Sequence, residues 1–336
     1  MSCSTIKDIA ILAGVSQSTV SRAFNMPGML RQETVLKVHE AARRCNYVYN
    51  ANAASLSNRR TDTLGVIIPS SAYSAFAINL MGIQKVCFEH NYSCRLAASQ
   101  FQPEKELQAM RKYHELRVSG LIMAGIDTSN IPYLRTMTAD GIPSIVLWES
   151  PGEDFNYIAV NNFKAAYEGV DYLISLGHKR IAFLSGPYAC ARRNLDRFTG
   201  YKAALADRGL PFRKDLVRSQ FPTFLDGKTS MRVCLALPEP PTAVLCANDY
   251  LAIGAIRAIH EMNLSVPDDV SVCGFDNVDI SAYFNPPITT MKTLGEKMGR
   301  MAAKAIITAI ANDEQLHAQY ILDAELIVRK SCAACK

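Results

Sequence analysis

The chain has 336 residues, of which 36 are Lys or Arg and 31 are Asp or Glu, so its formal net charge is +5. No run approaches the ~20 apolar residues that a membrane span needs, and the start lacks a signal peptide's basic and apolar regions, so we expect a cytoplasmic protein without a membrane partner. The ten cysteines are scattered, which in such a protein favours buried thiols over a disulfide framework.

The positive charge is concentrated at the start of the chain. Residues 1–60 hold eight basic and three acidic residues, whereas residues 61–336 hold 28 of each sign. A basic head on a neutral body is typical of a phosphate-binding module joined to a unit with another task.

The segment Thr5–Arg22 predicts two short helices joined by a tight turn. Apolar residues recur at spacings of three and four along the first helix, at Ile6, Ile9, Ala10 and Ala13. Gly14 supplies the backbone freedom that the turn needs. Ser16 is a suitable N-cap for the second helix, in which Val20 is the one apolar residue that we expect to be buried.

The second helix exposes a polar face with no acidic residue. This face consists of Gln17, Ser18, Ser21, Arg22 and Asn25. Amides, hydroxyls and one guanidinium match the donors and acceptors of base edges in the major groove of DNA. An ordinary surface helical hairpin, the alternative, would more often mix Glu and Lys on its exposed face. The pattern therefore favours DNA recognition.

A third helix is predicted over Leu30–Tyr49, and residues 50–58 follow it as a small, polar stretch whose one large apolar residue is Leu56. A helix formed by these nine residues alone would be marginal in water, because isolated helices below ~12–15 residues are rarely stable. The stretch is therefore either a flexible linker or a helix that forms only on DNA, with Leu56 as an apolar wedge.

After residue 61 short apolar runs alternate with amphipathic helical stretches in two consecutive series. The runs are Leu64–Ile68, Ser93–Ala97, Gly120–Ala124 and Ser144–Trp148, then Arg180–Leu184, Ala243–Ala247 and Val270–Phe275. Such alternation predicts parallel sheets with helices on both faces. Two series indicate two lobes, with a ligand cleft at the carboxyl ends of the strands.

No enzyme motif is complete. Gly227-Lys228-Thr229 resembles the end of a phosphate-binding loop, but the first glycine of that motif would fall on Pro222. The Gly-rich dinucleotide fingerprint and the nucleophile elbow are absent. Neither the six histidines nor the lone Cys332–Cys335 pair has the spacing of metal ligands. We therefore expect no catalytic residues, no metal site and no cofactor.

The order and spacing of several short motifs point to one family. In the head they are Ile6-Lys7-Asp8-Ile9-Ala10, Ala13-Gly14-Val15-Ser16, Thr19-Val20-Ser21-Arg22, Asn25, Asn46-Tyr47 and Asn50. In the body they include Leu176-Gly177-His178-Lys179-Arg180-Ile181-Ala182, Arg197-Phe198-Thr199-Gly200-Tyr201, Ala247-Asn248-Asp249 and Gly274-Phe275-Asp276. On these residues the chain resembles the lactose-repressor (LacI/GalR) family of transcription regulators over essentially its whole length.

The resemblance implies an all-α helix-turn-helix DNA-binding head (residues 1–49), a hinge helix and linker (50–60) and an effector-binding and dimerisation core (61–336). The core should resemble periplasmic sugar-binding proteins, with an α/β fold of two doubly wound parallel-sheet lobes. The expected N-lobe combines residues 61–160 with 293–322, and the expected C-lobe combines residues 161–292 with 323–336.

The resemblance further implies a homodimer whose heads bind the two halves of a near-palindromic double-stranded operator. In relatives the first two residues of the recognition helix and the Arg of the Val-Ser-Arg run read bases, which here are Gln17, Ser18 and Arg22. Leu56 aligns with the hinge leucine that wedges into the minor groove. The full set of expected DNA contacts is Thr5, Gln17, Ser18, Ser21, Arg22, Asn25, Asn50, Ala53 and Leu56.

Effector contacts of the family map onto Arg197, Asn248 and Asp276. Aromatic positions that the resemblance places in the same cleft are Tyr73, Phe76, Trp148 and Phe221. Arg, Asn and Asp side chains suit the hydroxyls of a polyol or, through Arg197, a carboxylate. The expected effector is thus a sugar or a sugar acid.

These residues support one main hypothesis for the function and leave three alternatives. The main reading is a repressor controlled allosterically by the effector, and Arg192, Arg193 and Arg197 favour a sugar acid, as in a gluconate-repressor type of regulator. The first alternative is a corepressor-type regulator of the same fold with a purine-like ligand. A periplasmic-type sugar-binding protein or a doubly wound enzyme would lack the basic head.

Overall fold

The structure, a computed structural model, describes residues 5–25, 27–47, 61–71, 73–187 and 191–336. The chain divides into two compact units, residues 1–61 and 62–336. The predicted hinge, with its expected DNA contacts Asn50, Ala53 and Leu56, lies outside the described residues. Within the described ranges no helix combines the length and apolar character needed to pass through a membrane.

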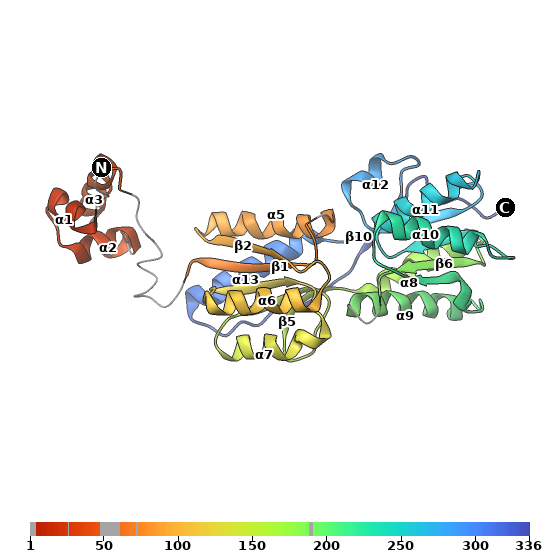
Figure 1. Cartoon of the computed structure of the whole chain (residues 1–336), viewed down its shortest axis with the longest axis horizontal. Helices are drawn as coiled ribbons and strands as arrows, with labels where there is room; N and C mark the ends of the chain where they lie inside the picture. Colours follow the sequence, from red (N-terminus) through yellow and green to blue (C-terminus); the bar gives the residue numbers. More distant parts are fainter. Residues whose placement is uncertain (1–4, 26, 48–60, 72, 188–190) are drawn as a thin grey trace. The chain divides into compact units, whose positions relative to one another are not determined.

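The described part of the head is a small bundle of helices (Figure 1). Its elements are α1 (Ile6–Ala13), α2 (Gln17–Asn25), the 3-10 helix η1 (Pro27–Met29) and α3 (Gln32–Arg44). Their apolar faces meet in a core of Ile9, Ala10, Val20, Ala23, Val38, Ala41 and Ala42. This core leaves the opposite face of α2 available for contacts outside the head.

The turn between α1 and α2 has the predicted chemistry. Gly14 adopts φ +67°, a left-handed conformation that costs glycine nothing because it has no Cβ atom. The Oγ of Ser16 accepts the N–H of Thr19 at 3.1 Å, so the predicted N-cap of α2 is confirmed.

Two predictions for the head were wrong in detail. Val20 is not the one apolar residue that α2 buries, because α2 packs against both α1 and α3 and buries Ala23 as well. The third helix ends at Arg44 rather than Tyr49. It ends there because Asn46 turns into the left-handed region, at φ +47°.

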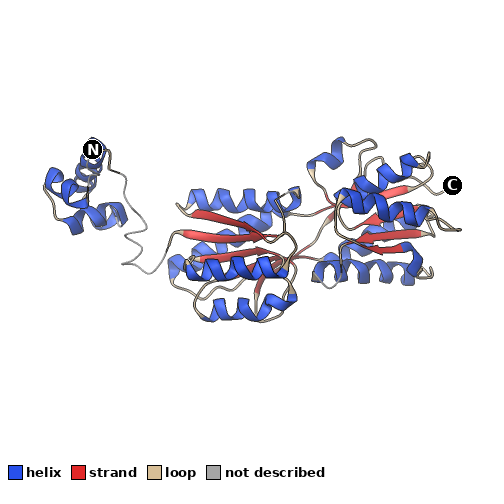
Figure 2. Ribbon diagram, in the orientation of Figure 1, coloured by secondary structure: helices blue, strands red, loops and turns tan. Residues whose placement is uncertain are grey.

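The N-lobe contains a parallel sheet with the strand order β11-β5-β4-β3-β1-β2. Its strands are β1 (Thr63–Ile68), β2 (Ser93–Ala98), β3 (Gly120–Ala124), β4 (Ser144–Trp148), β5 (Asn156–Val160) and β11 (Gln319–Leu322). One face is covered by α5 (Ser74–Glu89) and α13 (Gly295–Asn312), and the other by α6 (Pro103–Glu115), η2 (Thr128–Asn130) and α7 (Ile131–Ala139) (Figure 2). Residues alternate between the two cores along β1, since Val66 packs with α5 and α13 whereas Ile67 packs with α6.

The C-lobe contains the second sheet, with the strand order β12-β10-β9-β8-β6-β7. Its strands are β6 (Ile181–Ser185), β7 (Val217–Ser219), β8 (Ala243–Cys246), β9 (Ser271–Asp276), β10 (Thr289–Lys292) and β12 (Glu325–Ile327). Its helices are α8 (Asn162–Ser175), α9 (Arg192–Asp207), η4 (Lys214–Leu216), α10 (Phe224–Leu235), α11 (Asp249–Glu261) and α12 (Asp279–Tyr283). The expected parallel order holds except at one edge, where β12 runs antiparallel to β10.

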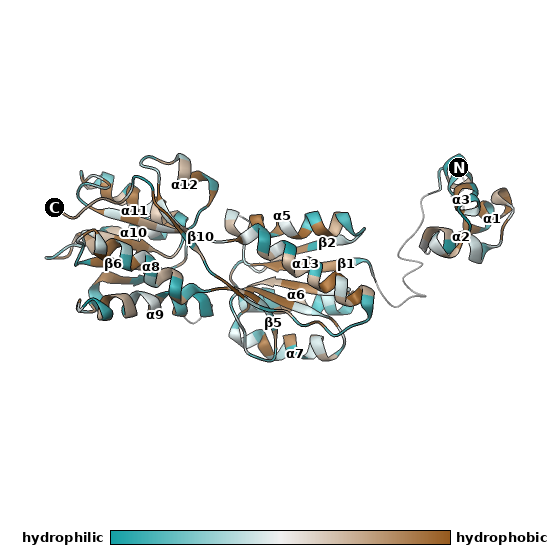
Figure 3. Cartoon of the chain, turned by 180° about the vertical axis from the view of Figure 1, so that it is seen from behind, coloured by the Kyte–Doolittle hydropathy of each residue, from teal (hydrophilic) through white to brown (hydrophobic). Residues whose placement is uncertain are grey.

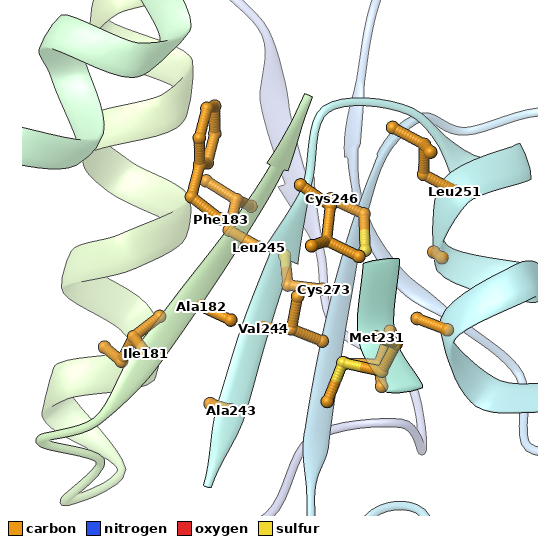
Figure 4. Close-up of a cluster of buried hydrophobic side chains, with 14 of the residues drawn as sticks. Ile181, Ala182, Phe183, Met231, Ala243, Val244, Leu245, Cys246, Leu251 and Cys273 are labelled. Carbon is orange, nitrogen blue, oxygen red and sulfur yellow. The ribbon is translucent and has the colours of Figure 1, made fainter. Parts of the chain in front are cut away.

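The core of each lobe lies between its sheet and its helices. Figure 3 shows hydrophobic colours along the strands of both sheets. In the C-lobe, Cys246 and Cys273 are buried among apolar side chains of β6, β8 and β9 (Figure 4). Burial raises the pKa of both thiols well above the ordinary value, so they remain protonated. The prediction of buried thiols is confirmed for these two residues.

Three stretches of the described chain pass between the lobes. They lie between β5 and α8, between β10 and α13, and between β11 and β12. The N-lobe sheet and its helical cover are therefore completed by α13 and β11, which come late in the chain.

The suspected phosphate-loop remnant is part of a helix. Gly227, Lys228 and Thr229 lie inside α10. A Cβ atom on Gly227 would lie 2.4 Å from the carbonyl oxygen of Leu251, so this glycine lets α10 pack closely on α11. The pattern reflects helix packing and not phosphate binding.

Candidate functional site

The exposed face of α2 carries the predicted base-reading residues. Gln17, Ser18 and Arg22 are exposed, Ser21 is half-buried, and Asn25 is the last residue of the helix. The first turn of α2 contains no acidic residue. Because an acidic side chain there would repel phosphates, this surface is suited to the backbone and bases of DNA.

Thr5, the other predicted DNA contact in the described head, has a structural task. Its hydroxyl donates to Oδ2 of Asp8 at 2.9 Å and accepts the N–H of Asp8 at 3.4 Å, which forms a capping box at the start of α1. The Thr5 bonds also lower the pKa of Asp8. The hydroxyl hydrogen of Thr5 is thus used inside the head.

A cleft of about 760 Å³, including its open mouth, lies between the two lobes. All seven predicted effector residues line it: Tyr73, Phe76, Trp148, Arg197, Phe221, Asn248 and Asp276. Further lining residues were not among the predicted effector contacts, although Arg193 had been counted among the charges that favour a sugar acid: Ala75, Phe101, Gly186, Pro187, Ala191, Arg193, Asn194, Pro222, Ala247 and Tyr250. The position matches the expectation for parallel sheets, since several of these residues end a strand or follow directly after one.

Arg197, on α9, is the buried cation of the cleft. Its Nε donates to Oδ1 of Asn162 at 2.8 Å, and its Nη1 donates to the carbonyl oxygen of Ala247. The guanidinium carbon lies 3.7 Å from the centre of the Phe275 ring. Burial lowers the pKa of Arg197 to about 10, so the side chain stays charged at neutral pH. The cation is therefore held in place before any ligand arrives.

Asp276, at the end of β9, supplies the matching acid. Its Oδ1 lies 4.0 Å from Nη2 of Arg197. Burial raises the pKa of Asp276, against the opposing effect of the nearby charges of Arg197 and Arg193. Its backbone is strained, with φ +97°, and Asn277 follows at φ +55°. Such conformations persist where the surroundings enforce them, and they cluster at functional sites.

Asp249, on α11, holds this strained turn through hydrogen bonds. Its Oδ2 accepts the N–H of Val278 at 2.8 Å, and its Oδ1 accepts the hydroxyl of Thr290 at 2.6 Å. Burial, opposed by the Thr290 bond and aided by the charge of Asp276, raises the pKa of Asp249 to about 7. This carboxyl group holds the turn that carries Asp276.

Asn248 uses part of its side chain for hydrogen bonds within the protein. Its Oδ1 accepts the N–H of Leu251 at 2.8 Å and so caps α11, and its Nδ2 donates to the carbonyl oxygen of Pro222 at 3.3 Å. An amide has a second N–H and a second lone pair. The capping role therefore leaves one donor and one acceptor site for a ligand.

An aromatic wall spans the cleft. The ring of Tyr73 in the N-lobe lies 5.0 Å from that of Tyr250 in the C-lobe, and the rings of Phe101 and Phe221 are 6.5 Å apart. Trp148 is buried, and its indole N–H donates to Asn79 at 2.7 Å. The indole N–H of Trp148 is therefore already used within the protein, and the ring can offer a ligand apolar contact.

Sequence reasoning counted Arg193 among the charges that favour a sugar acid but missed Glu149 and the ion pair that these two residues form across the cleft. Nη1 of Arg193 donates to Oε1 of Glu149 at 3.1 Å. Oε1 of Glu149 also accepts the N–H of Ile126 at 3.1 Å. Gly125 has φ +90°, and a Cβ atom there would lie 2.4 Å from the Arg193 guanidinium. A glycine that directly follows a buried strand was the signal available in the sequence.

The same two-part organisation occurs in known proteins. Residues 5–50 match the bacterial regulatory proteins of the lacI family, and residues 170–332 match the periplasmic binding protein-like domain. The transcriptional repressor PurR of Histophilus somni (strain 2336) is 34% identical over 329 residues, which cover 97% of this chain and 98% of the relative. The probable repressor ExuR of Bacillus subtilis (strain 168) is 33% identical over 336 residues, with coverage of 97% and 98%.

A solved structure shows the same likeness. The Lac repressor dimer bound to operator and the anti-inducer ONPF matches with a TM-score of 0.88 and 27% identity, covering 99% of this chain and 100% of that one. A helix-turn-helix head, a two-lobed core with a polar cleft, and repressors as relatives over nearly the whole chain agree with one another. The protein belongs to the lacI family of bacterial regulatory proteins and is a DNA-binding transcriptional regulator.

Proposed function

We propose that this regulator is a homodimeric repressor that binds a near-palindromic double-stranded operator through α2. The exposed Gln17, Ser18 and Arg22 support this assignment. Arg22 can bond bidentately to O6 and N7 of guanine, and Gln17 can do so to adenine. The two heads of a dimer would then contact two half-sites related by symmetry.

We propose further that a sugar or sugar acid in the cleft controls operator affinity. The observation that carries this proposal is that Arg197, Asn248 and Asp276 line one cleft between the lobes. A fixed cation, an amide and a carboxylate provide donors and acceptors for hydroxyl groups, and the aromatic wall can pack against a sugar ring. The ligand is bound and released unchanged, so the chain carries out no catalysis.

The chain contains a single tryptophan, and Trp148 lines the cleft. Its fluorescence therefore reports on the cleft without a label. Full-length protein should be titrated with D-gluconate, D-glucuronate, D-glucitol, D-glucose and hypoxanthine, and binding should then be repeated with Arg197→Ala. We expect a sugar or sugar acid to change the emission of the natural chain and not that of the variant.

Operator binding is tested separately by selecting sites from random DNA. The selected sites should be palindromic, and affinity should fall steeply as salt rises because phosphate contacts release counterions. Sequence-independent binding would overturn the operator assignment. A response to hypoxanthine alone would replace the sugar effector with a purine-like corepressor.

A further inference from the structure

A continuous chain of hydrogen bonds runs behind the cleft through buried polar side chains. Arg197 Nε donates to Oδ1 of Asn162 at 2.8 Å, and Nδ2 of Asn162 donates to the carbonyl oxygen of Trp148 at 2.9 Å. The indole N–H of Trp148 donates to Oδ1 of Asn79 at 2.7 Å, and Nδ2 of Asn79 donates to the carbonyl oxygen of Gly295 at 2.7 Å. The chain thus begins in the C-lobe and ends in the N-lobe.

Both N–H groups and the oxygen of the Asn162 side chain take part in this arrangement. Its oxygen accepts from Arg197, and its nitrogen donates to the carbonyl oxygens of both Trp148 and Val160. Asn162 is buried, where an unmade hydrogen bond is costly because water cannot replace it. A displacement of Arg197 must therefore either break this bond or be passed on through Asn162.

Two members of the hydrogen-bond chain, Asn162 and Gly295, lie at crossings between the lobes. Asn162 is the first residue of α8, directly after one crossing, and Gly295 is the first residue of α13, directly after the next. A Cβ atom on Gly299 would lie 2.1 Å from the carbonyl oxygen of Asn79, so α13 and α5 contact each other backbone to backbone. Asn79 is thus rigidly attached to the second crossing.

Trp148 is the strained member of the chain, with φ +76°. A non-glycine residue adopts that conformation only where its surroundings enforce it. The bond from Asn162 holds the carbonyl oxygen of Trp148, and the bond to Asn79 holds its ring. Loss of either asparagine should release the strain and shift the indole.

We propose that Asn162 and Asn79 are positioning residues that make the two walls of the cleft respond together. Asn162 joins Arg197 of the C-lobe to Trp148 of the N-lobe, and Asn79 passes a displacement of Trp148 to α13 at the second crossing. An effector that moves Arg197 would in this way shift the crossings between the lobes. That last step rests on the proposed effector role of the cleft, whereas the joining of the two walls does not.

A simpler role for Asn162, capping α8, is already filled by its neighbour. Oδ1 of Asn161 accepts the N–H of Lys164 at 3.2 Å and forms the N-cap. Asn161→Ala therefore removes a cap from the same crossing and leaves the hydrogen-bond chain intact. It is the matched control for Asn162→Ala.

The single tryptophan gives one indole N–H resonance in the full-length protein. Asn162→Ala should shift this resonance and speed its hydrogen exchange about tenfold or more, as loss of a buried hydrogen bond would. Asn161→Ala should leave both unchanged. An unchanged resonance in folded Asn162→Ala protein, or an equal shift in the control, would overturn the proposal.

A double-mutant cycle tests the link between the walls. Arg197→Lys removes the Nε donor, so it should shift the Trp148 resonance in the natural chain and have no further effect in Asn162→Ala. If Asn162→Ala does not fold, Asn162→Asp replaces it, because aspartate still accepts from Arg197 and cannot donate to Trp148. Additive shifts would refute the link. Since no ligand is used, a failure of every sugar to bind would overturn the proposed function and leave this result standing.

Discussion

Glu149 of the N-lobe caps a helix of the C-lobe. The backbone N–H of Arg193, in the first turn of α9, donates to Oε2 of Glu149 at 2.9 Å, and its side chain donates to Oε1 at 3.1 Å. The N-cap position of α9 is Ala191, which makes no side-chain cap bond. The carboxylate from the other lobe therefore satisfies the helix end that Ala191 leaves open.

Glu149→Ala should consequently lower the free energy of unfolding of the core. We expect about 3–5 kcal/mol, because the change leaves the charge of Arg193, whose side chain is only 12% exposed, without its partner. Glu149→Gln should cost less, since its oxygen can still accept from the helix. Urea unfolding followed by Trp148 fluorescence measures both variants. A loss no greater than that for Glu168→Ala, a half-buried glutamate on α8, would contradict this role.

Arg22→Ala should reduce specificity at one base pair in each half-site of the operator. The expected loss is about 1–3 kcal/mol per contact, because a bidentate pair with guanine is removed. Competition binding with operators altered at single positions identifies the affected pair. The control is Arg43→Ala, which removes an exposed charge from α3; it should weaken binding to all sequences equally. The same uniform loss with Arg22→Ala would show that Arg22 contacts only phosphate.

Asp249 should make the core less stable as pH rises. Burial raises the pKa of Asp249 from the ordinary 3.8 to about 7 in the folded protein. The protonated carboxyl group therefore stabilises the folded protein fully at a pH below the pKa of the unfolded chain, about 4. This contribution to the free energy of unfolding is lost as pH rises from about 4 through 7. Asp249→Asn should remove this decrease of stability with pH, because asparagine does not titrate. Its side chain can still accept from the N–H of Val278 and donate to Thr290.

Urea unfolding between pH 4 and 8 measures this effect. Asp279→Asn, which changes an exposed aspartate on α12, should keep the pH dependence of the natural chain. A pH profile that stays the same after Asp249→Asn would place the titrating group elsewhere.

Asp276→Ala should abolish the response to effector and spare operator binding. A hydrogen bond to a charged group contributes about 1.5–3 kcal/mol, so ligand affinity should fall roughly 10–150-fold. The effector should change operator affinity by about 5–150-fold in the natural chain. Trp148 fluorescence and operator binding, each with and without D-gluconate or the sugar that binds best, measure the two effects. A variant that still responds would mean that Asp276 does not contact the ligand.

Some of these features could be predicted from the sequence because their causes are local. The spacing of Ile9 and Ala10 in α1, the left-handed Gly14 and the Ser16 cap depend on neighbours within a few residues. Arg197 and Asp276 were placed by resemblance, and the structure brings them to one cleft. Their binding of a ligand stays a prediction.

Pairings between residues far apart in the sequence could not be predicted in the same way. Glu149 and Arg193 are 44 residues apart, and Trp148 and Asn79 are 69 apart. No local pattern relates such residues, because the first pair depends on how the two lobes meet and the second depends on how α5 packs against the N-lobe sheet. The antiparallel edge strand β12 also escaped prediction, since it has only three residues, Glu325–Ile327.

The crossing of the chain between lobes sets an order for folding during synthesis. Most of the C-lobe, from α8 to β10, has left the ribosome once Lys292 is exposed. The N-lobe begins earlier in the chain but still lacks α13, which covers one face of its sheet together with α5. Domains usually fold in the order in which they are made. Here the lobe that is started first still lacks a covering helix when most of the other lobe has been made, so a ribosome that stalls after residue 292 leaves the apolar residues Ile83 and Val86 of α5 without their cover.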